Sequence, residues 1–410
     1  MERGADMTIK QLTGLLFISS AAVWGCKKHY TPKAVSATNS YLVVEGVIAA
    51  GSDSTIINLS RTVQLTTADT HKPEIGAKVT VDDQQGVSYP LSEVDSGRYA
   101  AQPLNLDNSD KYRLDITTTD GQTYLSDYVP VKVTPPIDTV STPITARGLD
   151  INVSTHDPSN NTRYYRWNYT ETFIYQSDIE ADYIFDPTNP DTLKWSVLRT
   201  PEQQIHTCWV TLNSSIVNIN SSTALSRDVI NKNLVTQIPK ESEKIAHRYS
   251  ILVKQYALTQ DAYNFWNLLK SNTQNIGTIF DVQPSVNNGN IHCTSNPSLA
   301  VIGYVSASTI SRKRIFIDRA DLPVWPVPGY QECNPDPNVF QPNAICWPRA
   351  AAGPPSELIT GIYIPLGAID TVGVCYKEPV RAFSVKTVYY TCADCRFYMN
   401  GKTQKPAFWK

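Results

Sequence analysis

The sequence is poor in charged residues and in methionine. Charged residues make up 18% of its 410 positions, against ~25% in an average soluble domain, and there are only 3 methionines. The 36 basic residues nearly balance the 38 acidic ones. The chain therefore lacks the positive field with which proteins bind nucleic-acid phosphates, and we expect no nucleic-acid partner.

Motifs of catalysis are also absent from the sequence. It contains no G-x-S-x-G, no H-E-x-x-H, no phosphate-binding glycine-rich loop and no EF-hand, and its six histidines are dispersed. Asp178, Glu180 and Asp182 alternate, so a strand would place them on one face as a calcium site, as hydrolytic carboxylates or as a plain solvated surface. We predict that the chain is not an enzyme and has no metal or cofactor.

Tyrosine and proline are abundant, with 22 and 27 residues respectively. Together with the scarcity of methionine, they indicate a chain rich in strands and loops that works outside the cytoplasm.

The first 25 residues resemble an export signal. Lys10 precedes an apolar run from Leu12 to Val23, which is too short to cross ~30 Å of hydrocarbon as a helix. The run ends in Val-Trp-Gly-Cys26, which resembles a bacterial lipobox. We predict a lipoprotein signal peptide over 1–25, an acylated Cys26 that anchors the chain in the bilayer, and a flexible tether over 26–40. The alternative is an ordinary cleaved signal with an incidental cysteine.

The next segment, 41–136, has the pattern of a β-sandwich. Seven short alternating or β-branched runs follow one another, separated by turn signals such as Asp120-Gly121. No cysteine pair occurs in it. We predict an immunoglobulin-like β-sandwich of a type other than the antibody domain, with its boundary at the Pro135-Pro136 tract.

The remaining segment, 137–410, is predicted to be a larger β-rich domain. Strands are expected in runs such as 249–257 and 314–318. Thr259 is expected to cap one helix, because the following residues place an apolar face at helical spacing. A weaker helix is expected from Ser226. The predicted fold class is therefore mainly β, with one or two short helices.

A proline-rich loop over 321–355 stands apart within this domain. It holds nine prolines in 35 residues, a density that prevents regular strand pairing. We predict that its aromatic residues form a contact surface: Trp325, Tyr330, Phe340 and Trp347. The alternative is a structural insertion that covers a sheet edge.

Eight cysteines occur, and seven remain once Cys26 is acylated. Outside the inner membrane, disulfides are expected, and the candidates are Cys208, Cys293, Cys333, Cys346, Cys392 and Cys395. Cys375 is the candidate free thiol. The Cys392-x-x-Cys395 motif is compatible with a redox pair, half a zinc site or the ends of two different disulfides, and bonds to the proline-rich loop are favoured.

Several motifs resemble those of one family and occur in the same order. They include YLVVEGVI, GAKVTVDD, RYYRWNYTET, FDVQPSVNNGNIHC and CADCR with KPAFW. The family is an uncharacterised lipoprotein family of Bacteroidota, catalogued as a domain of unknown function and encoded beside TonB-dependent transporters. The resemblance covers about 41–410. It implies an accessory lipoprotein at the outer membrane that binds a TonB-dependent transporter barrel and helps capture or gate its substrate. We predict that it faces the cell surface, although the two lysines after Cys26 leave the periplasmic face open as an alternative. The alternatives are a surface hydrolase of glycans or peptides, and an adhesin or structural surface protein.

Overall fold

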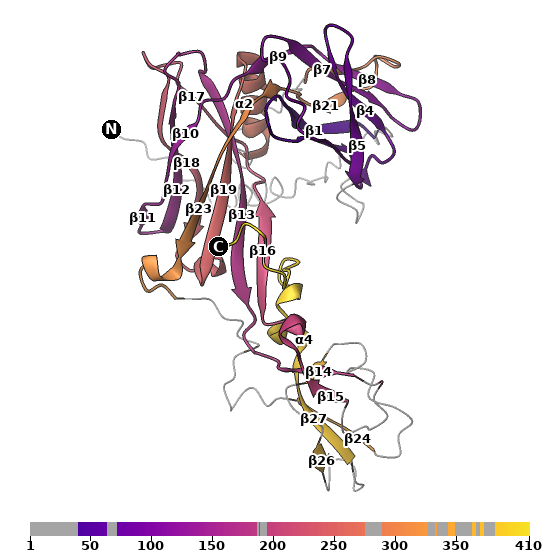
Figure 1. Ribbon diagram of the computed structural model, residues 1–410, viewed down its shortest axis with the longest axis vertical. Helices are drawn as coiled ribbons and strands as arrows, with labels where there is room; N and C mark the ends of the chain where they lie inside the picture. The colour runs from indigo at the N-terminus through magenta and orange to yellow at the C-terminus, as the bar shows by residue number, and fades with distance from the viewer. Residues whose placement is uncertain are drawn as a thin grey trace, which may run out of the picture. The chain divides into compact units, whose positions relative to one another are not determined.

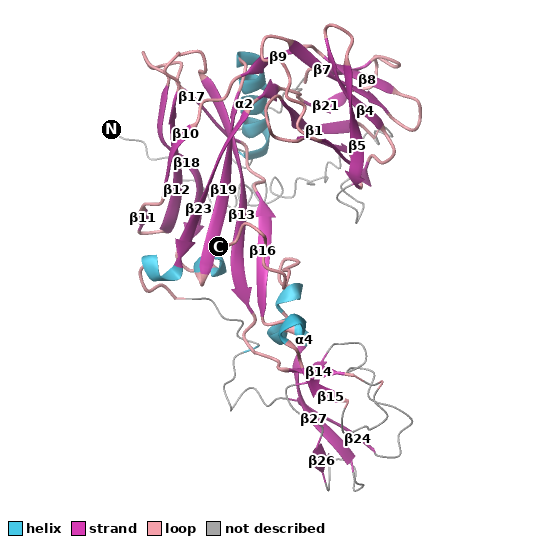
Figure 2. Ribbon diagram, in the orientation of Figure 1, coloured by secondary structure: helices cyan, strands magenta, loops and turns pink. Residues whose placement is uncertain are grey.

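Strands dominate the chain (Figures 1 and 2), as its many β-branched and aromatic residues favour. The structure, a computed structural model, describes residues 40–63, 72–186, 188, 195–274, 289–326, 333 and 390–410, and the backbone of four strands between 343 and 389. The compact unit that holds them spans Tyr41–Lys410. The prediction of a mainly β chain is confirmed. The signal peptide, Cys26 and almost all of the tether lie outside the described residues.

The first strands form a sheet that closes on itself. They are β1 (Leu42–Ala49), β2 (Thr55–Arg61), β3 (Lys72–Pro73), β4 (Lys78–Asp83), β5 (Ser88–Asp95), β6 (Arg98–Ala101), β7 (Lys111–Thr117), β8 (Thr123–Ser126) and β9 (Val129–Lys132). With the later strand β22 (Ala307–Ser308), the order β7-β4-β5-β6-β2-β1-β22-β9 returns to β7, which makes a ring. Alternate strand residues point inward, so Val79, Val81, Leu114 and Ile116 meet in one core.

Three later strands return to complete this ring. They are β20 (Ile291–Cys293), β21 (Val301–Gly303) and β22 (Ala307–Ser308). Strand β20 pairs with β8 and β21 pairs with β1, while β22 lies between β1 and β9 and pairs with both. Gly303 has φ +141°, and a Cβ there would lie 2.2 Å from the Val44 carbonyl oxygen, so only glycine fits this pairing. We call β1–β9 with β20–β22 the ring region. It is not one continuous stretch of sequence.

Two further sheets face each other across a second core. One contains β10 (Ile137–Ser141), β11 (Ile144–Thr145), β12 (Gly148–His156) and β18 (Val229–Pro239). The other contains β13 (Tyr164–Gln176), β16 (Thr207–Asn213), β17 (Asn218–Ser221), β19 (Arg248–Ala257) and β23 (Ile310–Asp318). Buried side chains from both sheets, among them Ile151, Trp167 and Ile251, form one cluster. We call this pair of sheets the sandwich region.

The helix α2 (Gln260–Gln274) forms where it was expected. The Thr259 hydroxyl accepts a hydrogen bond from the Ala262 N–H at 3.2 Å, which satisfies one free donor of the first turn. The helix packs on β13 and β17 (Figure 1). The second expected helix, from Ser226, is wrong: strand β18 begins at Val229 because its β-branched residues pair along β12.

The remaining elements are short. They are β14 (Tyr183–Phe185), β15 (Ser196–Leu198), β24 (Asn343–Pro348), β25 (Tyr363–Pro365), β26 (Asp370–Val372), β27 (Ala382–Tyr389), α4 (Tyr390–Ala393) and the 3₁₀ turns Pro201–Gln203, Glu243–Ile245, Arg319–Asp321 and Cys395–Phe397. Strand β27 pairs with β24, β25 and β26. Among the described residues, no helix is long and apolar enough to cross a bilayer.

Candidate functional site

Two disulfides join segments that are far apart in the sequence. Cys208 on β16 bonds to Cys395, 187 residues later, with a Cα–Cα distance of 5.6 Å. Cys333 bonds to Cys392, with a Cα–Cα distance of 5.4 Å. The Cys392-x-x-Cys395 motif therefore supplies the ends of two different disulfides, and one of them reaches into the proline-rich loop at Cys333.

The remaining cysteines divide into two groups. Cys293 was a candidate for a disulfide, and this prediction is wrong: it is a buried free thiol in the ring core, where its Sγ lies 3.4 Å from the Ser295 hydroxyl. Strand β20 carries it into the ring core, whereas the four disulfide-bonded cysteines are buried in the second core and in a separate small cluster. The Cys346 side chain and the whole of Cys375 lie outside the described residues.

A small core surrounds the Cys333–Cys392 disulfide, whereas Cys208 and Cys395 are buried in the second core. Cys333 and Cys392 are buried with Ala181, Ile205 and Ala393. Nearby, Tyr175 and Tyr398 stack with ring centroids 4.0 Å apart. We call the described residues within 177–206, with Cys333 and 390–401, the disulfide region.

Polar side chains in the disulfide region are engaged in holding its chain together. The Ser177 hydroxyl is buried, donates to the Ala393 carbonyl at 3.1 Å and lies 3.0 Å from Nδ1 of His206. Asp394 is buried and pairs with Arg396, whose pKa is raised by that hydrogen bond. A buried serine that bonds to main-chain carbonyls is a tie between segments, which favours a structural role for this serine–histidine contact.

The predicted aromatic contact surface is described only at its start. Trp325 is partly buried against the second core, and its carbonyl accepts a hydrogen bond from Arg319 at 2.8 Å. Its neighbour Val324 is 98% exposed. Tyr330, Phe340 and the Trp347 side chain lie outside the described residues. The contact surface therefore stays a prediction, with Val324 as its exposed apolar residue.

The last residues of the chain form a feature that sequence reasoning missed. They lie across the sheet β16-β13-β19-β23, where Trp409 is 5% exposed and packs edge-on against Phe316, with ring centroids 5.6 Å apart. Arg314 lies 3.6 Å above the Phe408 ring. The aromatic residues in KPAFW were the signal, since large apolar groups near a chain end need a surface on which to bury.

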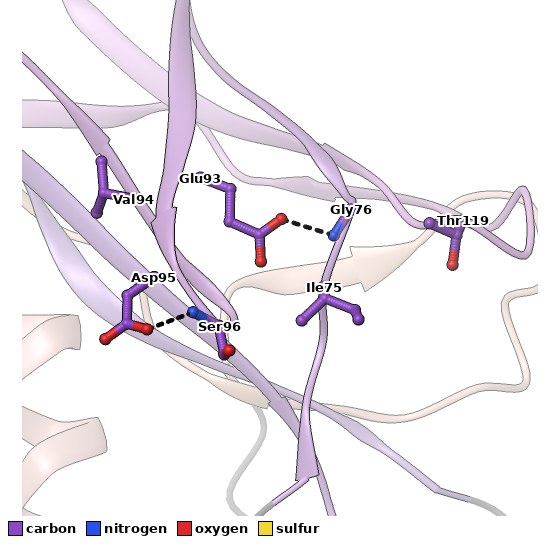
Figure 3. Close-up of a pocket in the computed structure, with 7 residues that line it drawn as sticks. All are labelled: Ile75, Gly76, Glu93, Val94, Asp95, Ser96 and Thr119. Carbon is purple, nitrogen blue, oxygen red and sulfur yellow. Dashed lines mark hydrogen bonds between the residues drawn. The ribbon is translucent and has the colours of Figure 1, made fainter. Parts of the chain in front are cut away.

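A shallow depression opens on the ring region (Figure 3). It is lined by Ile75, Gly76, Glu93, Val94, Asp95, Ser96 and Thr119. The two oxygens of Glu93 accept backbone N–H groups of Gly76 at 2.8 Å and Gly97 at 3.0 Å, and Asp95 accepts the N–H of Ser96. These carboxylates fix two turns, which favours a structural role over acid–base chemistry.

The row of alternating acids does not lie on a strand. Residues 177–182 bend between β13 and β14, so Asp178, Glu180 and Asp182 share no strand face, and each of them is exposed. Within the described part of the chain, no group of three or more histidine, cysteine, aspartate or glutamate side chains is placed to hold a metal. No regular strand forms because the backbone of 177–182 bonds to three different segments: the Ser177 and Ile179 N–H groups donate to the carbonyls of His206 and Cys392, and the Asp182 carbonyl accepts from Arg199. Strand pairing resumes at Tyr183, where β14 meets β15.

Comparisons with known proteins bear on the family. A sequence model described as a domain of unknown function, DUF4249, matches residues 27–314. No curated protein matches the chain. A crystal structure of a DUF3823 family protein from Parabacteroides merdae is similar at 8% identity, over 53% of this chain and 90% of that one, with a TM-score of 0.13. That TM-score is too low to carry an argument about the fold.

Proposed function

Because the chain belongs to the DUF4249 family, whose function is unknown, we propose the function that the resemblance of its motifs implies, together with the chemistry of its own residues. The chain is a lipid-anchored accessory protein of the outer membrane that binds a TonB-dependent transporter and helps capture or gate its substrate. It acts as a binding partner and not as an enzyme. Its body faces the cell surface, held by acyl chains on Cys26.

The observation that carries this proposal is the disulfide region together with the lipobox-like sequence before Cys26. Disulfides form and persist outside the reducing cytosol, and two of them join Cys392 and Cys395 to Cys333 and Cys208. A lipid-modified cysteine would hold such a body at a bilayer surface. Both features support an exported protein that remains attached to a membrane.

The disulfide between Cys333 and Cys392 also supports a binding role for the proline-rich loop. The bond fixes one point of a loop that begins beside Val324 and Trp325. Fixing a loop lowers the entropy lost when it meets a partner, and rigid aromatic groups add contact area at little entropic cost. We therefore assign the partner contact to the surface around Val324.

The proposal is tested by affinity purification of the tagged full chain from native membranes in mild detergent after gentle crosslinking. A TonB-dependent barrel protein is expected to be recovered with it. Recovery of the lipoprotein alone would contradict the proposal and favour an adhesin or structural role. Hydrolysis of a glycan or peptide by the purified chain would favour the hydrolase alternative.

Two variants of exposed valines sharpen this test. Val324→Asp places a charge on the assigned contact surface and should reduce barrel recovery about tenfold or more, because an unpaired charge would be desolvated in the interface. Val94→Asp is the matched control, since Val94 is 60% exposed but lies in the depression of the ring region. Equal recovery with both variants would contradict the assignment of the contact surface.

A further inference from the structure

Arg166 is a buried cation on the outer face of the sandwich region. Its neighbours on β13, Tyr165 and Trp167, point into the second core, so Arg166 points to the opposite face of the sheet, towards α2. There its guanidinium lies 4.2 Å from the centroid of the Trp266 ring and 4.9 Å from that of Tyr256. Figure 1 shows α2 beside β13 and β19, which supply these residues.

No described residue supplies a hydrogen-bond acceptor to the guanidinium. Arg166 is only 6% exposed, and its buried Nε has no partner. The buried Nε1 of Trp266 also has none. Glu45 on β1 attracts Arg166 electrostatically but makes no ion pair with it. Two neighbouring N–H donors are therefore buried without an acceptor.

Two other arginines differ from Arg166 in the charged partners of their side chains. Arg113 and Arg248 also have a buried Nε without a hydrogen bond, but each faces a carboxylate. The Nε–oxygen distances are 3.7 Å from Arg113 to Asp82 and 2.9 Å from Arg248 to Asp318. Among the described residues, no carboxylate lies within ion-pair distance of Arg166, so its charge is compensated by aromatic rings and by the more distant Glu45.

Aromatic rings compensate this charge incompletely. A ring attracts the cation through its face, whereas the N–H groups of a guanidinium lie in its own plane and require oxygen acceptors. An unpaired buried charge is costly, and burial lowers the pKa of Arg166, although guanidinium stays charged. Oxygens that carry negative charge would supply the acceptors that these donors lack.

The surrounding face is positively charged. Strand register places Asn168, Lys254 and Arg312 in one row across β13, β19 and β23, next to the row of Arg166 and Tyr256. Burial lowers the pKa of Lys254; Asp53 opposes this shift, and the cations Arg312, Arg98 and Arg314 add to it. Asp53 pairs with Arg312 at 3.0 Å and leaves the other cations in excess. Such a field attracts anions.

We infer that Arg166 and Trp266 form a binding site for an oxyanion, a group in which two or more oxygens share negative charge, such as a carboxylate or a phosphate. The Nε–H of Arg166 and the Nε1–H of Trp266 donate to its oxygens, and Lys254 with Arg312 attracts it to this face. The inference does not depend on the proposed transporter partner.

The site is tested by anion titration of the purified full chain. Sodium phosphate and sodium acetate are added separately at constant ionic strength set with sodium chloride, and the thermal unfolding midpoint is measured. A rise with phosphate alone assigns a phosphate site, and a rise with acetate alone assigns a carboxylate site. No rise with either anion would overturn the inference.

Two variants locate the response. Arg166→Met should weaken anion binding by about tenfold or more, as expected for loss of a charged hydrogen bond, and Trp266→Phe should weaken it about three- to tenfold. An unchanged response in Arg166→Met would overturn the inference.

A chloride-only comparison separates binding from structural support. Without oxyanions, Arg166→Met should keep or raise the unfolding midpoint, because it removes an uncompensated buried charge. The matched control is Arg61→Met, which should lower the midpoint because Arg61 pairs with Glu74 at 2.6 Å and both side chains are only 12% exposed. An equal fall in both variants would assign Arg166 a structural role and overturn the inference.

Discussion

The ring region and the disulfide region are held together by different means. In the ring region, strands from residues 42–132 and 291–308 bury a broad apolar core, and Cys293 in that core remains a free thiol. In the disulfide region, the described core consists of a few small side chains around Cys333 and Cys392. A segment that buries little apolar surface gains little free energy of folding from the hydrophobic effect. In the disulfide region, disulfide bonds supply stability that apolar burial does not.

Removing a disulfide should have the largest effect and should act on one region alone. The double variant C333A/C392A opens a loop of 59 residues and should lower the free energy of unfolding by about 2–5 kcal/mol. Urea unfolding measures this loss, and limited proteolysis should show faster cleavage near residue 392 with the ring region intact. Simultaneous loosening of both regions would contradict the comparison.

Cys293→Ala is the matched control for that variant. It removes a buried cysteine of the ring core that forms no disulfide, so only the packing of one sulfur is lost. Its free energy of unfolding should fall by about 1 kcal/mol, within the range for small changes in buried volume. A loss as large as that of the double variant would show that packing, and not the covalent bond, explains the disulfide result.

Cavity-forming substitutions should show which of the two cores contributes more to the free energy of unfolding. Ile57→Ala in the ring core removes a fully buried side chain and should cost about 2–5 kcal/mol. Ile205 is 3% exposed and lies beside Ala181 and Ala393. Ile205→Ala should lower the free energy of unfolding less than Ile57→Ala does, because the small neighbours of Ile205 make fewer apolar contacts with it. Thermal and urea unfolding of both variants check this order, and the reverse order would contradict it.

The turns of the ring region provide a smaller test. Glu93→Ala removes the acceptor for two backbone N–H groups and should cost about 1 kcal/mol. Asp95→Ala, whose carboxylate accepts only from the adjacent Ser96 N–H, should have little effect. Equal losses in the two variants would show that the bridge made by Glu93 is not what stabilises these turns.

Two histidines of the sandwich region should give the smallest effects, with opposite signs. Burial and nearby His206 lower the pKa of His247, so the unfolded chain takes up this proton first and stability falls as the pH drops below about 6.5. The hydrogen bond to Asp138 raises the pKa of His156. Its contribution is complete below about pH 6.5 and is lost as the pH rises through the raised pKa.

Histidine NMR titration measures both pKa values directly. Unfolding midpoints at several pH values should show that His247→Gln flattens the acid side of the profile and His156→Gln the alkaline side. The same change from both variants would contradict the opposite signs.

The sequence carried the local features of this fold but not its long-range pairings. Alternation predicted strands such as β19, and Thr259 with an apolar stripe predicted α2. The return of β22 to the ring was not predictable, because two residues carry no pattern that selects a partner strand. Disulfide pairing was open for the same reason, since Cys208 and Cys395 meet only through the fold.

The oxyanion site was hidden for a related reason. Arg166 occupies an ordinary position in an alternating strand, and nothing in its neighbours in the sequence marks it as buried. Its environment arises when α2 brings Trp266 over β13, and the missing acceptor becomes visible only in three dimensions. The exposed row Asp178, Glu180 and Asp182 shows the converse, since an evident sequence pattern produced no common face.

Mass spectrometry of the native amino terminus tests the central claim of a membrane-tethered binding protein most directly. We expect the protein isolated from membranes to begin at Cys26 and to carry diacylglycerol on the thiol and a further acyl chain on the amine. A mature terminus without lipid, or one that begins after Cys26, would contradict it.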